Sequence, residues 1–250
     1  MEENNTIYAA WDKYAKVYDT LCTLTPYMEL VTQVTNTVSC SRDSHILDVG
    51  CGTGNLLASL QTRHPRVKLT GVDGSCTMLA EVSRKYPESQ FILRRANFNE
   101  KLPFAADVFT HLVSVNVLYA VEDPIYTLSE MYRVLKKGGS LTLVTPKIGY
   151  ENGLILKEHA KSNKTDQYWK GAHISEEREL ALIKEAVHDQ KLQNALMEIA
   201  SHNRQIASTS TFHFFNQSGL IHLVKSIGFS LISTVSCYAK QGLLLQARKE

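Results

Sequence analysis

The chain lacks a charge excess, a paired cysteine pattern and a long apolar run. Its 27 Lys and Arg residues nearly balance its 25 Asp and Glu residues, for a formal net charge of +2. Without a basic stripe, a nucleic acid is a poor candidate for its partner. The five cysteines are odd in number and show no metal-ligand spacing. We therefore expect no metal site and reduced, structural thiols.

No apolar stretch reaches the roughly 18 residues that a membrane-spanning helix needs, and the first five residues are polar and acidic. We therefore expect a cytoplasmic protein without a membrane span. Apolar residues are nevertheless plentiful, since 44% of the 250 residues are hydrophobic, which suits one α/β domain with a cap. A small molecule is then the favoured partner. The sequence does not indicate an oligomeric state.

A glycine-rich turn is the most informative stretch of the sequence. Residues 46–49 are mostly apolar and suit a strand that is buried on both faces. Three glycines follow at alternate positions, namely Gly50, Gly52 and Gly54. Glycine tolerates positive φ and lets a ligand approach the backbone, and the helix that starts at Asn55 directs its free amides at the turn. The stretch predicts a cradle for a bound cofactor.

The spacing of the glycines and a neighbouring acid narrow the choice of ligand. Only Thr53 separates Gly52 from Gly54, whereas the dinucleotide fingerprint has two residues between its second and third glycines. Asp48 would repel a pyrophosphate and attract a cationic amino group. Residues 48–54 resemble the E/D-x-G-x-G-x-G motif of class I methyltransferases, which use S-adenosylmethionine. The resemblance implies this cofactor and a Rossmann-like, doubly wound α/β fold.

A second acid, Asp73, ends the next apolar strand about twenty residues after the glycines. A carboxylate at a strand tip can accept two hydrogen bonds from a ribose diol. The alternative is that Asp73 caps the following helix, but Ser75 is better placed for that role, so we favour the ribose. Met78, one turn into this helix, either lies against the adenine or fills the core.

The ends of two further strands complete the predicted site. The resemblance implies that the Asn97 amide accepts a bond from the adenine amino group and that Phe98 offers its backbone amide, although Asn97 can equally shape the turn. Val115 and Asn116 are expected near the transferred methyl group, because ligands of α/β sheets bind beyond the carboxyl ends of the strands. Tyr119 follows them and either orients the acceptor or walls the pocket.

Aromatic residues recur at helical spacing near the N-terminus, with Trp11, Tyr14 and Tyr18 as the main members. This segment resembles the N-terminal cap of small-molecule methyltransferases such as those of quinone methylation. The resemblance implies that such tyrosines face the cofactor or the acceptor. Aromatic residues at this spacing also serve plain packing, so both roles stay open for Tyr14 and Tyr18.

We expect one methyltransferase domain over residues 1–250, made of four segments. The segments are an N-terminal helical cap at 1–40, a cofactor-binding core at 41–146, an inserted helical cap at 147–210, and a closing helix and strand pair at 211–250. The pair Gly138 and Gly139 predicts the end of the helix that begins after Asp123. A short link between the last two strands favours an antiparallel pair, which gives a seven-stranded mixed sheet with an antiparallel last strand.

The resemblance implies an enzyme that transfers a methyl group from S-adenosylmethionine, and we expect the acceptor to be an oxygen or nitrogen of a small metabolite. A sulfonium activates its own methyl group, so the protein chiefly positions the acceptor, and the sequence identifies no catalytic residue. The alternatives are a non-catalytic binding or regulatory subunit and aminopropyl transfer on the same fold. The candidate cofactor-binding residues are Tyr14, Asp48, Gly50, Gly52, Thr53, Asp73, Gly74, Met78, Asn97, Phe98, Val115 and Asn116. The candidate acceptor-binding residues are Tyr18 and Tyr119.

Overall fold

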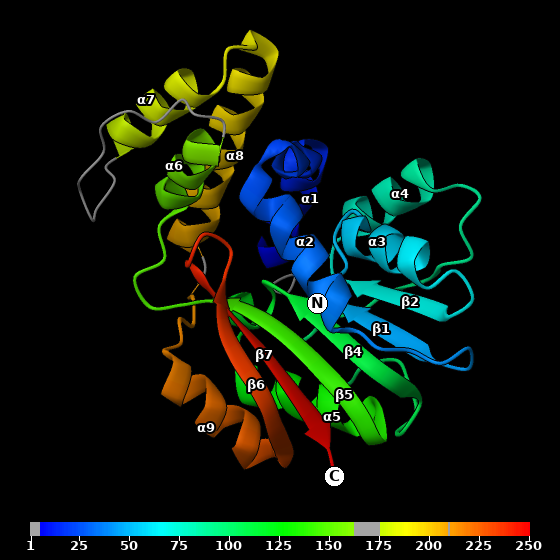
Figure 1. The fold of residues 1–250 in the computed structure, drawn as a ribbon. Helices are drawn as coiled ribbons and strands as arrows, with labels where there is room; N and C mark the ends of the chain where they lie inside the picture. Colours follow the sequence, from blue (N-terminus) through cyan, green and yellow to red (C-terminus); the bar gives the residue numbers. More distant parts are fainter. Residues whose placement is uncertain (1–5, 163–175, 210) are drawn as a thin grey trace.

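A seven-stranded mixed sheet forms the centre of the computed structural model, which describes residues 6–162, 176–209 and 211–250 (Figure 1). The strands are β1 (His45–Val49), β2 (Lys68–Asp73), β3 (Ile92–Arg95), β4 (Phe109–Val115), β5 (Leu135–Pro146), β6 (Phe229–Cys237) and β7 (Gly242–Lys249). They lie in the order β3-β2-β1-β4-β5-β7-β6. The first five strands pair in parallel, and β7 runs antiparallel to both β5 and β6. The predicted fold class is confirmed.

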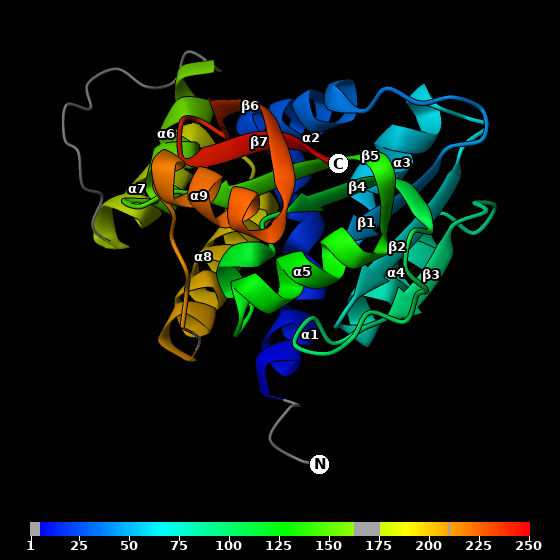
Figure 2. The ribbon, with the colours of Figure 1, turned by 90° about the horizontal axis from the view of Figure 1, so that it is seen from below.

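Helices cover both faces of this sheet (Figure 2). One face carries α2 (Thr25–Thr37) and α3 (Asn55–Arg63), and the other carries α5 (Pro124–Val134) and α9 (Gln217–Ile227). Successive residues of β1 point to opposite faces, so Ile46 joins the core under α2 and α3 while Leu47 joins the core under α5. Both side chains are fully buried. The same alternation turns Asp48 toward the side of α2 and α3.

A second group of helices stands beyond the carboxyl ends of the strands (Figure 1). It consists of α1 (Thr6–Tyr18), α6 (Asn152–Ser162), α7 (Glu176–Ala186) and α8 (Gln190–Thr209). The helix α1 packs against both α8 and α4 (Cys76–Lys85). The predicted inserted cap spans α6, α7 and α8, while its residues 163–175 and 210 lie outside the described residues. Within the described ranges, no helix combines the length and hydropathy of a membrane span.

The helix before β5 ends earlier than the glycine signal predicts. Asp123 caps α5 as expected, accepting hydrogen bonds from two backbone N–H groups of the first turn. The helix nevertheless ends at Val134, and β5 follows at once. The register between β4 and β5 shifts between Phe109 and His111, and Gly138, with a φ of 75°, lies in this irregular part of β5. The glycine serves a strand irregularity rather than a helix end.

Candidate functional site

The turn between β1 and α3 has the backbone conformation that its glycines predict. Gly50, Gly52 and Gly54 have φ angles of 76°, 52° and 83°, which is the left-handed region that favours glycine. Gly50 also has no room for a side chain, because an added Cβ would overlap Val117. The Gly50 N–H donates to the Val72 carbonyl oxygen at 2.8 Å and so ties the turn to β2. The turn therefore exposes bare backbone at the strand ends.

Asp73 joins this turn to the start of α4. One of its carboxylate oxygens accepts a bond from the Gly52 N–H at 2.8 Å, and the other accepts from the Ser75 N–H at 2.9 Å. Ser75 is itself the N-cap of α4, since its hydroxyl oxygen accepts from the Met78 N–H at 3.0 Å. Burial raises the pKa of Asp73 to about 6, although the backbone bonds act to lower it. The carboxylate is thus mainly ionised at neutral pH.

A cavity under α1 brings together eight residues that the sequence predicts for the site. They are Tyr18, Gly50, Gly52, Asp73, Met78, Phe98, Val115 and Asn116. Asn116 has a positive φ of 55°, and its buried amide oxygen has no hydrogen-bond partner among the described residues. A strained backbone together with an unpartnered acceptor is typical of a ligand site. Tyr8, Trp11 and Asn99 also line the cavity, although the sequence patterns do not assign them to the site.

Asp48 lies behind the turn, on the side of α2 and α3. Its Oδ2 atom is buried and has no hydrogen-bond partner in the part of the chain that the structure describes. It lines a small cavity of about 30 Å³, and Tyr18, Gly50 and Val115 line both this cavity and the one under α1. Burial, with a contribution from the charge of Asp73, raises the pKa of Asp48 to about 8. A buried acid without a partner fits an ammonium group.

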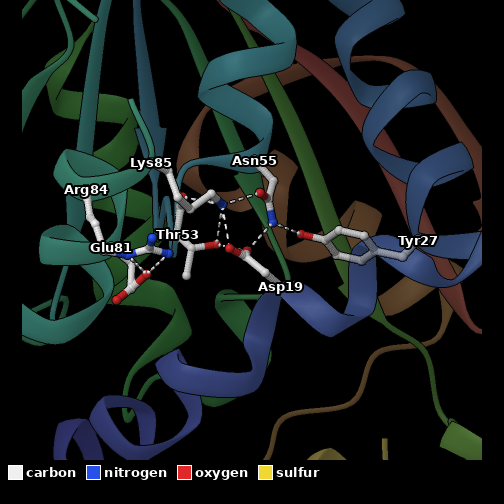
Figure 3. Close-up of polar contacts among 7 residues, drawn as sticks. All are labelled: Asp19, Tyr27, Thr53, Asn55, Glu81, Arg84 and Lys85. Atoms are coloured by element: carbon white, nitrogen blue, oxygen red, sulfur yellow. Dashed lines mark hydrogen bonds and ion pairs between the residues drawn. The ribbon is translucent and has the colours of Figure 1, made fainter. Parts of the chain in front are cut away.

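A polar cluster fastens the end of α1 to the glycine turn (Figure 3). Asp19, just after α1, accepts hydrogen bonds from Thr53 at 2.5 Å and from Asn55 at 3.1 Å. Lys85 of α4 forms an ion pair with the other Asp19 oxygen at 2.7 Å. Burial acts to raise the pKa of Asp19, but the bonds from Lys85, Thr53 and Asn55 outweigh it and lower the pKa. The Thr53 hydroxyl is engaged here, and its predicted cofactor contact stays a prediction.

We expect Asp19→Asn to lower the free energy of unfolding by about 1–2 kcal/mol at pH 7, because Lys85 loses a partly screened carboxylate. The pKa of Asp19 lies below its ordinary value of 3.8 in the folded protein. Its stabilising contribution is therefore present above pH 3.8 and is lost as the pH falls through the lower, folded value. Urea unfolding at pH 7 and pH 3 measures both effects.

The matched control is Glu81→Gln, which breaks the more exposed ion pair between Glu81 and Arg84 at 2.7 Å (Figure 3). Solvent screens such an exposed pair, so Glu81→Gln is expected to lower the free energy of unfolding less than Asp19→Asn does. Equal losses for the two variants would contradict a fastening role for Asp19. The sequence patterns missed this cluster because an ion pair between distant segments leaves no local signal.

Three other residues predicted to bind the cofactor do not line the cavity under α1. Tyr14 is buried and packs against the ring of Tyr18, with ring centroids 5.3 Å apart. Gly74 lies against the Tyr8 ring, and the Asn97 amide oxygen accepts a bond from the Tyr8 hydroxyl. The roles assigned to these three residues stay predictions.

A larger cavity of about 430 Å³ shares the lining residue Trp11 with the cavity under α1. Its lining is mostly aromatic and consists of Trp11, Tyr119, Tyr150, Asn152, Asn203, Ile206, Ala207, Phe212 and Phe214. Among the described residues no Asp, Glu, Lys, Arg or His lines it. The Tyr119 ring lies 4.8 Å from that of Phe212, between centroids, and burial raises the pKa of Tyr119 well above its ordinary value. Because Trp11 lines both cavities, they adjoin at this side chain.

Comparison with known proteins finds a domain match that covers less than half of the chain. Residues 47–143 match the family described as "Methyltransferase domain". The chain is 42% identical to a demethylmenaquinone methyltransferase of Chlorobaculum parvum over 108 residues. This aligned stretch covers 43% of each protein. The chain is also 36% identical to a ubiquinone/menaquinone biosynthesis C-methyltransferase of Desulfotalea psychrophila over 94 residues. This second stretch covers 38% of each protein. The match thus spans less than half the length of these curated relatives.

The solved structures extend the likeness to the whole fold. An S-adenosylmethionine dependent methyltransferase from Mesorhizobium loti superposes with a TM-score of 0.60 over 87% of this chain and 96% of that one. The sequence identity is 18%, so this likeness concerns the fold.

Proposed function

We propose that this chain is a class I methyltransferase that binds S-adenosylmethionine and transfers the activated methyl group to a small acceptor. The match of residues 47–143 to a methyltransferase domain and the fold support this proposal. The observation that carries the proposal is the pair of acids at the glycine turn. Asp73 suits the two hydroxyl groups of a ribose, and the unpartnered oxygen of Asp48 suits an ammonium group. A ligand that carries both groups is an amino-acid nucleoside. The dinucleotides lack the ammonium group.

The bound cofactor supplies a methyl group that its sulfonium makes electrophilic. The residues of the chain then have to hold two molecules in line and keep water out. Asp73 would hold the ribose, Met78 and Phe98 would give the base an apolar surface, and Asn116 would face the reacting end from the tip of β4. Positioning of this kind can lower the barrier by about 7–11 kcal/mol.

The acceptor, in this proposal, occupies the aromatic cavity beyond Trp11. A charged acceptor would find no countercharge among the described lining residues, and burial of an unpaired charge is costly. Flat rings pack well against the aromatic walls, and Asn152 and Asn203 offer donors and acceptors for a polar substituent. We therefore propose a planar, uncharged acceptor. Oxygen or nitrogen is the first candidate for the methylated atom, and carbon, which the name of the Desulfotalea relative specifies, is the second.

The high pKa of Tyr119 also bears on the chemistry. A buried tyrosine of this kind holds its proton at neutral pH and does not act as a general base. Burial likewise raises the pKa of Tyr150, the other tyrosine of the lining, well above its ordinary value, and no Asp, Glu or His is present among the described lining residues. The acceptor atom must then be nucleophilic on arrival or lose its proton to water.

Two measurements test the proposal. Calorimetry is expected to show binding of S-adenosylmethionine and S-adenosylhomocysteine and no binding of NAD. Incubation with methyl-labelled cofactor and a panel of planar acceptors, charged and uncharged, is expected to label the uncharged ones, with the modified atom identified by mass spectrometry. Tight NAD binding without a response to either sulfur nucleoside would overturn the cofactor assignment. Binding without any labelled product would favour a non-catalytic subunit, and transfer from decarboxylated S-adenosylmethionine would favour aminopropyl transfer.

A further inference from the structure

A tyrosine of α1 already satisfies two polar groups at the rim of the cofactor cavity. The Tyr8 hydroxyl donates to Asn97 Oδ1 at 2.9 Å and accepts from the Phe98 backbone N–H at 3.2 Å. The orientation of the Asn97 amide is set by its other contacts. Its Oδ1 atom also accepts from the Asn99 N–H at 3.1 Å, and its Nδ2 atom donates to Glu100 at 2.9 Å. An acceptor and a donor therefore face Tyr8 side by side.

This acceptor and donor complement the pairing edge of adenine, which presents an amino donor beside a ring-nitrogen acceptor. A phenol hydroxyl donates and accepts through one atom, so Tyr8 can satisfy both groups. The Tyr8 ring also lies over Gly74, where an added Cβ would overlap it. Gly74 directly follows Asp73, the residue proposed for the ribose. The Tyr8 ring thus lies directly beside the residue proposed to hold the ribose.

The space that remains under α1 is small for a cofactor. The cavity measures about 80 Å³, whereas ligand pockets measure roughly 300–1,000 Å³. The helix is held in this position by Asp12, whose carboxylate accepts bonds from the Ser75 hydroxyl and the Thr77 N–H. In the structure described here, α1 and its Tyr8 side chain therefore fill part of the nucleoside site.

We propose that Tyr8 is an internal substitute for the adenine base and must leave Asn97 and Phe98 before the cofactor can bind. This inference rests on the proposed function, since it requires an adenine nucleoside as the cofactor. Trp11 lies one helical turn further along α1 and lines both cavities. Displacement of α1 also moves Trp11, which lines the acceptor cavity. The cofactor therefore binds first and the acceptor second.

Removal of the Tyr8 hydroxyl tests the competition directly. When a side chain of the protein occupies a site, only the molecules with a free site can bind the ligand. The apparent affinity is then the intrinsic affinity multiplied by the fraction of free sites. Tyr8→Phe removes two neutral hydrogen bonds from the occupied state and none from the cofactor complex. We expect S-adenosylhomocysteine to bind about 3- to 30-fold more tightly to Tyr8→Phe than to the unmodified protein, through faster association at an unchanged dissociation rate. Tyr8→Ala, which also removes the ring, is expected to bind at least as tightly as Tyr8→Phe.

The experiment uses calorimetry and stopped-flow kinetics with the full chain. The matched control is Tyr126→Phe, since Tyr126 is an exposed tyrosine on α5, and its affinity is expected to be unchanged. S-inosylhomocysteine, whose base has the reversed donor and acceptor edge, is expected to bind more weakly than S-adenosylhomocysteine to every variant. Suppose that the unmodified protein binds S-adenosylhomocysteine. If both Tyr8 variants bind it equally tightly, Tyr8 does not compete with the cofactor, and if both bind it more weakly, Tyr8 contacts the cofactor; either result contradicts the proposal. Equal binding of the two bases would also overturn it, while a complete lack of binding would overturn the proposed function itself.

Discussion

At neutral pH, Asp48→Asn is expected to stabilise the protein without its ligand and to weaken its binding of S-adenosylmethionine. Burial raises the pKa of Asp48 to about 8 from its ordinary value of 3.8. Between these two values the unfolded chain ionises while the folded protein keeps its proton, so folding becomes less favourable as the pH rises. The cost levels off above pH 8. Asparagine never ionises, and the gain at pH 7 is on the order of a few kcal/mol.

The Asp48 carboxyl also makes cofactor binding depend on pH, in the opposite direction to stability: a higher pH destabilises the free protein but strengthens binding. An ammonium group beside Asp48 favours the ionised acid, so binding at pH 7 releases the proton that the free protein holds. The affinity for S-adenosylmethionine is expected to rise from about pH 6 to about pH 8, by at most about tenfold per pH unit. In Asp48→Asn the affinity should be lower and the rise should disappear.

Urea unfolding across a pH series and calorimetry in two buffers of different ionisation enthalpy measure these effects. The unmodified protein is its own control, because the stability difference between it and Asp48→Asn should shrink as the pH approaches 4. A variant that is less stable than the unmodified protein at pH 7 would show that the carboxylate is already stabilised in the free protein. The unpartnered oxygen of Asp48 would then need another explanation.

The fold and the strand-end residues could be predicted because their signals are local. An apolar run followed by alternating glycines specifies a strand and a left-handed turn, and Ser75 three residues before Met78 specifies the helix start. The end of α5 was predicted wrongly because the same Gly138 signal serves a helix end and a strand irregularity. Only the pairing of β5 with its neighbours decides between the two.

The wall of the site built by α1 could not be predicted in the same way. The bond between Tyr8 and Asn97 joins residues 89 apart in the chain, and the bond between Asp19 and Thr53 joins residues 34 apart. No spacing rule connects such pairs. A partial signal existed for the aromatic cavity, since an aromatic cluster stands at 212–215, but without the fold nothing placed it beside Tyr119.

A comparison of Asp73 with Asp123 can distinguish a helix-capping role from a ligand-binding role. Each carboxylate accepts two hydrogen bonds from backbone N–H groups. Both donors to Asp123 lie in the first turn of α5, whereas Asp73 accepts from Ser75 at the start of α4 and from Gly52 in the glycine turn. Asp73 lines the cavity under α1, whereas Asp123 is exposed at the start of α5. The two sites therefore share backbone N–H donors but differ in burial, in the bond to the glycine turn and in whether they line the cavity.

We expect Asp73→Ala to weaken binding of S-adenosylhomocysteine by about 1.5–3 kcal/mol, the range for hydrogen bonds to a charged group, and Asp123→Ala to leave it unchanged. Asp123→Ala should lower the free energy of unfolding by about 0.5–2 kcal/mol through loss of the cap. Asp73→Ala should lower it less at pH 7, because the raised pKa means that its buried, ionised carboxylate already disfavours folding above pH 6. Calorimetry and urea unfolding of the same samples decide the matter. If Asp73→Ala binds the nucleoside as tightly as Asp123→Ala does, Asp73 is a structural acceptor for the turn and the ribose must be held elsewhere.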